Sequence, residues 1–413
     1  MKDRQTTAIV GGGAAGLAAA FAACVRGDRV AVYERMDRVG KKMLATGNGR
    51  GNLMNSGDPR YPGGGDFARR VFEACGPDDL RLFWGRLGLR IAEEEDGRCY
   101  PITRQASTIL DTLRFHLEVP SVSFLTGTRV TGLRRDGEMW RVTSDAGERA
   151  FRRVIVCGGG MAQPKLGSDG SAYALLSSLG HRLVRPRPAL TPIETDPAPI
   201  RGLAGIRVRC GVRVMRDSAC LHEERGELLF TEHGVSGICV MQSARWAAPD
   251  TVLAIDLTDG ADPDSILQAL TARRDVTWRA HPAERLLTGL LPPRLAERVM
   301  EAAGVRIRDR RTDDLPDEEL RRLAETLRGF KLRVRGAKGF DAAQVTAGGI
   351  ATDGFDPATL RSKLAPGIHA AGEILDVDGD CGGFNLMFAF AGGLLAGWDG
   401  NGIIEALKRG PTV

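Results

Sequence analysis

The segment IVGGGAAGLAAAFAACVRGDRVAVYER, residues 9–35, constrains what this chain can fold into more than any other. A short β-type run, Thr7–Val10, leads into the glycines, and an alanine-rich run, Ala14–Arg26, is typical of a helix. A second β-type run, Arg29–Tyr33, ends at Glu34. Strand, glycine turn, helix, strand and acid follow one another in this order in a Rossmann unit, which binds a dinucleotide. A cleaved leader peptide is the alternative, but the glycines interrupt the apolar run that a leader needs.

The glycines and the acid of this segment each have a physical role in such a unit. Gly11 permits the tight turn, Gly13 lets the backbone approach a diphosphate, and Gly16 lets the helix lie close to the strand. The first helical amides then face the diphosphate with the positive end of the helix dipole. Glu34 is placed to bind a ribose 2′-hydroxyl and would repel a 2′-phosphate, which disfavours NADP here. A glycine-rich turn that binds nothing is the alternative. The predicted contacts are Gly11, Gly13, Ala14, Ala15, Gly16, Glu34 and Arg35.

The next stretch, RMDRVGKKMLATGNGRGNLMN at residues 35–55, has neither helical nor strand periodicity. It is either an exposed loop or a set of backbone and side-chain amides arranged around a polar ligand. We favour the ligand, because its asparagines stand beside glycines that allow close approach. The Rossmann motif alone does not distinguish FAD from NAD. The predicted contacts in this stretch are Lys42, Thr46, Gly47, Asn48, Arg50 and Asn52.

A second glycine-rich segment follows the strand-like run RRVIV. This segment, RRVIVCGGG at residues 152–160, ends in three glycines whose backbone can approach a ligand. For a second dinucleotide fingerprint the sixth position should be glycine, but it is Gln163, and no acid ends a matching strand. We therefore interpret Gly158 and Gly159, together with Val130 on an earlier strand, as further contacts to the same dinucleotide. No separate NAD(P)H domain is expected.

A third glycine-rich segment lies near the C-terminus. A short strand, Ile368–Ala371, is followed by Gly-Glu, and an apolar helix starts at Phe384. Gly382 and Gly383 would expose backbone amides at the start of that helix. The helix dipole would there stabilise negative charge on a reduced flavin.

Three segments together resemble the bacterial HI0933-like, or aminoacetone-oxidase-like, FAD-binding flavoproteins. They are GGGAAG…GKKMLATGNGRGNLMN, VIVCGGGMAQPKLGSDG and GEILDVDGDCGGFNLMFAFAGG. Bile-acid ene-reductase-like enzymes belong to that family. The resemblance implies one non-covalent FAD in a discontinuous Rossmann-type domain with an inserted β-barrel and a helical piece. This chain departs from the family pattern at Gly51, where cysteine is frequent, and at Ile238, where proline is common. The resemblance implies flavin contacts at Gly372, Glu373, Asp380, Gly383, Phe384 and Asn385.

The middle of the chain supplies the inserted parts. Between Thr191 and Asp256, short alternating runs separated by glycine and proline predict an antiparallel barrel or sandwich. Residues 263–328 change to helical spacing, with helices that start near proline or aspartate. We therefore predict an α/β fold with three parts: a discontinuous FAD-binding domain of residues 1–190 and 335–413, a β-barrel insert of residues 191–262, and a helical insert of residues 263–334.

The composition narrows the partners and the compartment. The chain has 57 lysines and arginines against 52 aspartates and glutamates, without a clustered basic stripe, so we expect no nucleic-acid partner. The apolar run Leu386–Gly397 is shorter than the roughly 20 residues that span a bilayer, so we expect no membrane role. The 8 cysteines form no C-x-x-C pair and no Cys/His cluster, which predicts no metal site and a reducing, cytoplasmic setting. The oligomeric state is left open.

An acid or base for catalysis must come from a side chain near the flavin. The candidates are His233, in TEHGVSG, and Tyr100, in GRCYPITRQAS, although each is also explained as a structural residue. Cys381 has no second cysteine or histidine near it in sequence, and we interpret it as structural.

The residues and the resemblance together predict an FAD-dependent oxidoreductase. We expect it to reduce an activated C=C bond of a small conjugated substrate, steroid-like, bile-acid-like or another enone, with NAD(P)H as the hydride donor. An FAD-dependent oxidase that passes electrons from an aminoacetone-like amine to O₂ is the alternative. A flavin-dependent RNA-modification factor and a redox sensor without turnover are further alternatives.

Overall fold

The computed structural model describes residues 6–94 and 96–409, and the chain divides into two compact units. The first unit is the chain up to Pro188 together with the chain from Gln344 onward, and the second is Ala189–Ala343. Within the described residues, no helix is long and apolar enough to cross a membrane.

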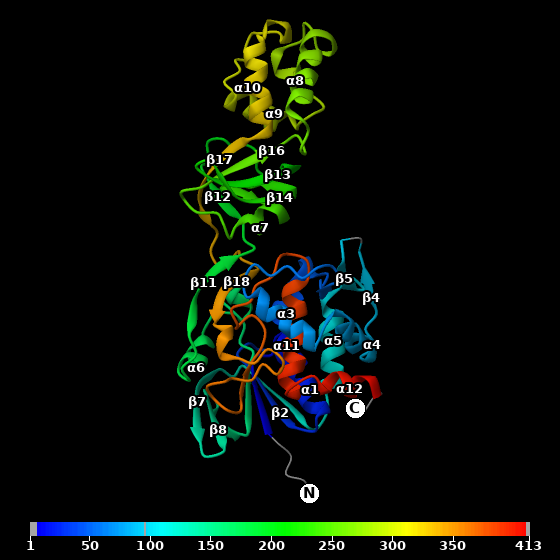
Figure 1. Cartoon of the computed structure of the whole chain (residues 1–413), viewed down its shortest axis with the longest axis vertical. Helices are drawn as coiled ribbons and strands as arrows, with labels where there is room; N and C mark the ends of the chain where they lie inside the picture. Colours follow the sequence, from blue (N-terminus) through cyan, green and yellow to red (C-terminus); the bar gives the residue numbers. More distant parts are fainter. Residues whose placement is uncertain (1–5, 95, 410–413) are drawn as a thin grey trace. The chain divides into compact units, whose positions relative to one another are not determined.

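The first unit is built on a five-stranded sheet with the strand order β19-β10-β1-β2-β6, in which all neighbours are parallel. Figure 1 labels β2 of this sheet and the helices α1, α5 and α11 of the same unit. The strands β1 and β10 are buried along nearly their whole length, which explains the apolar runs of residues 8–10 and 154–156. Helix α1 (Ala14–Val25) connects β1 to β2, as the glycine motif predicts, so the Rossmann-type fold is confirmed. The strands are β1 (Thr6–Val10), β2 (Arg29–Glu34), β6 (Val122–Thr126), β10 (Arg153–Val156) and β19 (Ile368–Ala370).

The helix α11 (Phe384–Trp398), which precedes the last described helix of the chain, is buried over most of its length and packs along α1. Glycines permit this close approach. A Cβ atom on Gly393 would lie 2.3 Å from the carbonyl oxygen of Ala15, and one on Gly397 would lie 2.3 Å from that of Ala19. Glycine weakens a helix interior, so these two residues are explained by the packing that they allow.

Short helices and small sheets make up the rest of the first unit. The sheets have the orders β3-β5-β4, β7-β8-β9 and β11-β18. Their strands are β3 (Met54–Asn55), β4 (Ile91–Glu93), β5 (Arg98–Pro101), β7 (Val130–Asp136), β8 (Met139–Ser144), β9 (Gly147–Phe151), β11 (Leu183–Ala189) and β18 (Val345–Ile350). The helices are α2 (Lys41–Leu44), α3 (Gly65–Ala74), α4 (Pro77–Arg86), α5 (Ala106–Leu117), α6 (Tyr173–Ser177) and α12 (Gly402–Arg409), with 3₁₀ turns η1 (Thr46–Gly49), η2 (Pro164–Leu166) and η6 (Thr352–Gly354).

The second unit contains a closed barrel with the strand order β12-β15-β14-β13-β16-β17 and a helical part with its own apolar core. The strands are β12 (Ile193–Thr195), β13 (Arg207–Arg216), β14 (Ala219–Phe230), β15 (Gly234–Ser236), β16 (Val252–Asp256) and β17 (Phe330–Ala337). The helices are α7 (Ile238–Ser243), α8 (Pro263–Ala272), α9 (Pro293–Ala302) and α10 (Asp317–Arg328), with the short helical turns η3 (Arg273–Thr277), η4 (Ala283–Arg285) and η5 (Thr312–Asp314).

The boundaries in the second half of the chain differ from those expected from the sequence. Strand β17 pairs antiparallel with β16 and β12 and closes the barrel, although it lies beyond residues 191–262. Its last residues fall within 335–413, which the sequence assigned to the FAD-binding domain; the first unit resumes only at Gln344. The helices are therefore an insertion between two paired strands of the barrel.

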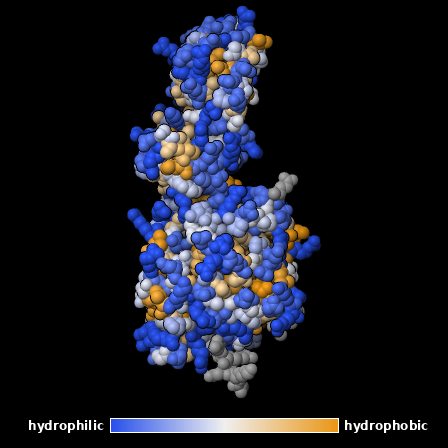
Figure 2. All heavy atoms as spheres, viewed as in Figure 1, coloured by the Kyte–Doolittle hydropathy of each residue, from blue (hydrophilic) through white to orange (hydrophobic). Residues whose placement is uncertain are grey.

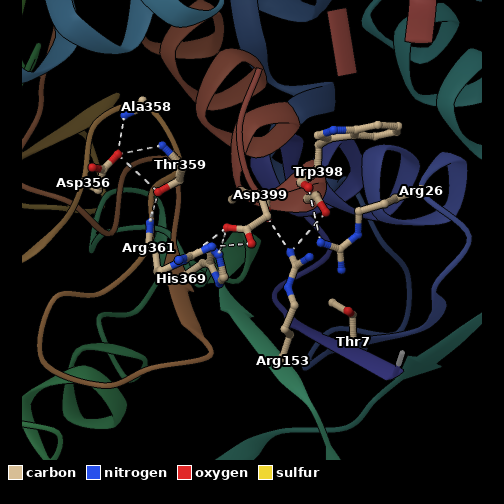
Figure 3. A network of polar contacts seen from close by, with 12 residues as sticks. Thr7, Arg26, Arg153, Asp356, Ala358, Thr359, Arg361, His369, Trp398 and Asp399 are labelled. Atoms are coloured by element: carbon tan, nitrogen blue, oxygen red, sulfur yellow. Dashed lines mark hydrogen bonds and ion pairs between the residues drawn. The ribbon is translucent and has the colours of Figure 1, made fainter. Parts of the chain in front are cut away.

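A polar network lies at the amino-terminal ends of β1 and β10 (Figure 3). Arg153 donates to two carbonyl oxygens in the last turn of α11, at 2.6 and 3.1 Å. Thr7 donates to Asp28 at 2.6 Å, and the His369 Nε2 atom lies 3.0 Å from the Asp399 carboxylate. The Arg153 hydrogen bonds satisfy carbonyl groups that a helix end leaves without partners. Together with the contact between His369 on β19 and Asp399 after α11, they attach the end of α11 to the sheet.

Exposed large apolar side chains are few and scattered, and hydrophilic residues dominate the face drawn in Figure 2. Single exposed apolar residues are ordinary on protein surfaces and indicate no docking site by themselves. The exposed large apolar residues are Ile102, Phe115, Leu183, Ile238, Val276, Leu290 and Leu364.

Candidate cofactor site

A cavity opens beside the carboxyl ends of β1, β2 and β10. This is the edge at which a parallel sheet with crossover helices binds its ligands. The predicted contacts that line the cavity are Gly11, Gly13, Glu34, Arg35, Lys42, Val130, Gly158 and Gly159.

The glycines of the first turn have the roles that the sequence indicates. Gly11 has a φ of +104°, and a Cβ atom on it would lie 2.4 Å from the carbonyl oxygen of Cys157. A Cβ atom on Gly16 would lie 1.9 Å from the carbonyl oxygen of Gly11, so this residue serves helix packing. A Cβ atom on Gly13 would meet nothing within 4 Å. The backbone at Gly13 is thus open to a ligand, as a diphosphate requires.

Glu34 is buried and held in place by the backbone on both sides. One carboxylate oxygen accepts a hydrogen bond from the Gly12 amide at 2.9 Å, and the other accepts one from the Met36 amide at 2.8 Å. Each carboxylate oxygen has a further lone pair, so Glu34 can also accept from a ribose hydroxyl in the cavity that it lines.

A lysine and a glutamate from distant segments meet at the site. The Lys42 ammonium lies 2.6 Å from the Glu373 carboxylate, which also accepts from the Thr346 amide at 2.9 Å. Lys42 lines the cavity, and Glu373 fixes the position of its charge. A fixed cation beside open glycine backbone suits a diphosphate.

The sequence missed one wall of the cavity. Part of it comes from the segment that follows Gly158 and Gly159, and Ser168 in this segment has a buried hydroxyl without a hydrogen-bond partner among the described residues. Its residues belong to the motif GGGMAQPKLGSDG, which was the available signal. The lining residues that the sequence did not single out are Val10, Tyr33, Gly40, Lys41, Thr128, Arg129, Cys157, Leu166, Gly167, Ser168, Ser171, Ala172 and Leu175.

The glycine and asparagine loop packs against the C-terminal glycines, as one site requires. Asn55 donates to the carbonyl of Gly382 at 2.9 Å. A Cβ atom on Gly383 would lie 2.7 Å from Asn52 Oδ1, a buried atom without a partner among the described residues. The amide of Asn385 instead bonds both backbone groups of Gly379, at 2.8 and 2.9 Å, so this side chain is engaged in its own turn.

The other predicted contacts are not part of the cavity lining, and their contact with a flavin stays a prediction. Gly372 packs against α1, because a Cβ atom on it would lie 2.8 Å from the Ala15 Cβ atom. These residues are Ala14, Ala15, Gly16, Thr46, Gly47, Asn48, Arg50, Asn52, Gly372, Glu373, Asp380, Gly383, Phe384 and Asn385.

The two catalytic candidates lie in different units. Tyr100, on β5, is buried against the loop, with the Arg50 and Arg104 guanidinium carbons 4.9 and 5.1 Å from its ring centre. Burial raises the pKa of its hydroxyl. His233 is exposed in the turn between β14 and β15 of the second unit and is not a lining residue of the cavity. Burial also raises the pKa of the Cys381 thiol, which makes it a poor nucleophile.

The observed groups fit a dinucleotide: an open glycine backbone, a fixed acid, a fixed lysine and buried polar atoms without partners. The model of the HI0933-like protein Rossmann domain matches residues 5–399. A 3-dehydro-bile acid delta(4,6)-reductase of Clostridium scindens is 36% identical over 406 residues, which are 94% of this chain and 97% of the relative. Ribosomal RNA dihydrouridine synthases of Escherichia coli and Haemophilus influenzae are 26% and 25% identical, over 94% and 95% of this chain and 96% and 97% of their own lengths. The family supports FAD as the dinucleotide. This chain belongs to the HI0933-like family.

Proposed function

We propose that this chain is an FAD-dependent reductase that saturates a carbon–carbon double bond conjugated with a carbonyl group in a steroid-like or bile-acid-like substrate, with NAD(P)H as the hydride donor. The match to the bile-acid reductase, 36% identical over 94% of this chain, carries the proposal. Glu34 and Lys42 in the cavity support its cofactor part. When bound, FAD supplies the hydride transfer, and the protein supplies position, charge and exclusion of water.

The names of the relatives describe one type of chemistry on two substrates. A delta(4,6)-reductase of a 3-dehydro-bile acid saturates ring double bonds near a carbonyl group. A dihydrouridine synthase saturates the ring double bond of uridine, which is likewise conjugated with a carbonyl group. Such a reaction adds a hydride at one carbon and a proton at its neighbour. This shared chemistry supports a reductase over the amine oxidase.

Tyr100 is the proposed proton donor of this reaction. Its hydroxyl carries a proton at neutral pH, because the ordinary tyrosine pKa of 10.0 lies far above it and burial raises the pKa further. We expect Tyr100→Phe to leave flavin reduction by NAD(P)H unchanged and to slow reoxidation by the substrate by about 10²-fold or more. Stopped-flow measurement of the two half-reactions separates these effects. Equal slowing of both half-reactions would contradict a role in proton donation.

The overall proposal is tested by anaerobic mixing of the purified flavoprotein with NADH and with NADPH. Bleaching of the visible flavin band by either, followed by its return with a keto steroid that carries conjugated ring double bonds, is the expected result. A flavin that neither nicotinamide bleaches contradicts the proposed donor. Release of peroxide on mixing with an aminoacetone-like amine, without nicotinamide, would show that the protein is an amine oxidase. A protein that binds FAD but turns over with no electron donor would instead be a redox sensor.

A ribosomal RNA dihydrouridine synthase is the second candidate. Two relatives with this name match along at least 94% of this chain, although at 26% and 25% identity. The balance of 57 basic and 52 acidic residues weakens this candidate, because RNA binding draws on clustered positive charge. Reoxidation of the reduced flavin by unmodified ribosomal RNA, with no reoxidation by keto steroids, would reverse the order of the two candidates.

A further inference from the structure

One wall of the cavity is the loop between η2 and α6, residues 167–172. It folds back on the second glycine turn, where the Gly170 amide donates to the carbonyl of Gly160 at 2.9 Å. The Asp169 carboxylate accepts from the Ser171 amide at 3.0 Å and forms an ion pair with Arg35. The loop is therefore held at two neighbouring residues, and Ser168 directly precedes them.

The Ser168 hydroxyl is the unusual group in this loop. The residue is only 4% exposed, and its Oγ atom has no hydrogen-bond partner among the described residues. It lines the cavity next to Gly159, on which a Cβ atom would lie 2.7 Å from this Oγ atom. Buried hydroxyl groups in folded proteins are nearly always hydrogen-bonded, because an unpaired one loses its contacts with water without replacement. Because Ser168 lines the cavity, a molecule bound there can supply the missing partner.

The residues around Ser168 indicate which part of a dinucleotide would contact its hydroxyl. A Cβ atom on the neighbouring Gly167 would lie 3.8 Å from an oxygen of Glu34, the acid expected to hold a ribose. Arg35 and Lys42 line the same cavity and favour negatively charged oxygens. The chemistry that meets all of these groups is a ribose joined to a diphosphate.

We propose that the Ser168 hydroxyl donates a hydrogen bond to an oxygen of the adenosine ribose–diphosphate part of the dinucleotide. Ser168 is then a binding residue for the cofactor, and its loop is the wall that closes over the adenosine half. The inference rests on the proposed FAD dependence and adds the residue and the half of the cofactor that it contacts.

The test is titration of the flavin-free full chain with FAD and, separately, with ADP, which has the ribose–diphosphate but no flavin. We expect Ser168→Ala to raise the Kd for both ligands by about 10-fold. Ser178→Ala is the matched control, because the Ser178 hydroxyl donates to the carbonyl of Leu175 at 2.8 Å and Ser178 is not a lining residue. It should leave both Kd values within about twofold of the parent.

Thermal unfolding of the flavin-free protein separates binding from a structural role. A hydroxyl without a partner contributes nothing to the folded state, so Ser168→Ala should melt at the parent temperature or above it. A lower melting temperature together with an unchanged Kd would overturn the proposal, as would a weakened Kd for FAD with an unchanged Kd for ADP. A parent protein that binds neither ligand would instead refute the proposed FAD dependence.

Discussion

At the residue scale, Gly51 shows why this chain departs from its family's pattern. The resemblance would place a cysteine here, but the φ of Gly51 is +72°. A Cβ atom on it would lie 2.7 Å from Ile109 Cδ1 and 2.9 Å from the Cα atom of Ala106, both in α5. Any side chain at this position therefore has two costs. The backbone is strained, because residues other than glycine disfavour a positive φ, and the Cβ atom overlaps with the backbone of α5, which cannot move easily.

We expect Gly51→Cys to lower the free energy of unfolding by about 2–4 kcal/mol, as the sum of strain and overlap. Gly49→Ala is the matched control, because Gly49 has a φ of +82° in the same loop but a Cβ atom on it would meet nothing within 4 Å. It should cost only the strain, about 1–2 kcal/mol. Urea unfolding measures both values. Equal losses in the two variants would mean that the overlap with α5 relaxes without cost.

The sequence predicts the role of a residue only where neighbouring residues in the chain determine that role. Gly11, Gly13 and Glu34 were predictable because a crossover unit has the same local geometry wherever it occurs. Ser168 was not, because its importance comes from burial by a loop that other segments hold in place.

At the element scale, the contact between α1 and α11 predicts different effects of alanine at two neighbouring glycines of α11. Gly392 and Gly393 are neighbours in α11, but a Cβ atom on Gly393 would lie 2.3 Å from the carbonyl oxygen of Ala15, and one on Gly392 would meet its nearest atom at 3.7 Å. We expect Gly393→Ala to destabilise the protein by about 1–3 kcal/mol through overpacking. Gly392→Ala should be neutral or stabilising by up to about 1 kcal/mol, because alanine favours the helix. Denaturant midpoints measure the difference, and a similar loss for both variants would show that the helices separate freely.

The strand β17 shows which elements the sequence could not place. Its alternating burial, with apolar residues inward, is a local pattern that indicates a strand. Its partners β12 and β16 lie on the far side of the helical insertion, and pairing between distant segments leaves no trace in either sequence alone. The sequence therefore predicted that a barrel is present but did not assign its last strand to it. The sequence instead divided this strand between the helical insert of residues 263–334 and the FAD-binding domain of residues 335–413.

At the scale of the whole molecule, the first unit is assembled from the two ends of the chain. Its sheet takes β19 from the C-terminal part and β1, β2, β6 and β10 from the N-terminal part. The glycine motifs at both ends made this predictable, because both were expected to contact one dinucleotide. The network around Arg153 was not predictable, since its groups come from β10, β19 and the C-terminal ends of α1 and α11.

This network makes the stability of the first unit depend on pH. His369 is 1% exposed, next to Asp399, with Arg153 and Arg361 as the nearby cations. Burial lowers the pKa of His369 to about 4, and the two arginines act in the same direction, while Asp399 opposes them. As the pH falls below the ordinary histidine pKa of 6.5, His369 becomes protonated in the unfolded chain but stays neutral in the folded protein. The stabilisation is therefore complete above that value and is lost progressively towards a pH of about 4.

We expect the free energy of unfolding to fall by about 2 kcal/mol from this histidine alone between about pH 7 and about pH 5. His369→Gln keeps a donor near Asp399 and removes the titration, so its profile should be flatter over this range even if its stability at neutral pH is lower. His281→Gln is the control, because His281 is exposed in the second unit and should keep the parent's slope. Urea unfolding across this pH range gives the three slopes. A parent slope that His369→Gln reproduces would mean that folding does not change the pKa of His369. A parent that loses less stability than His369→Gln as the pH falls would mean that Asp399 holds His369 protonated in the folded protein.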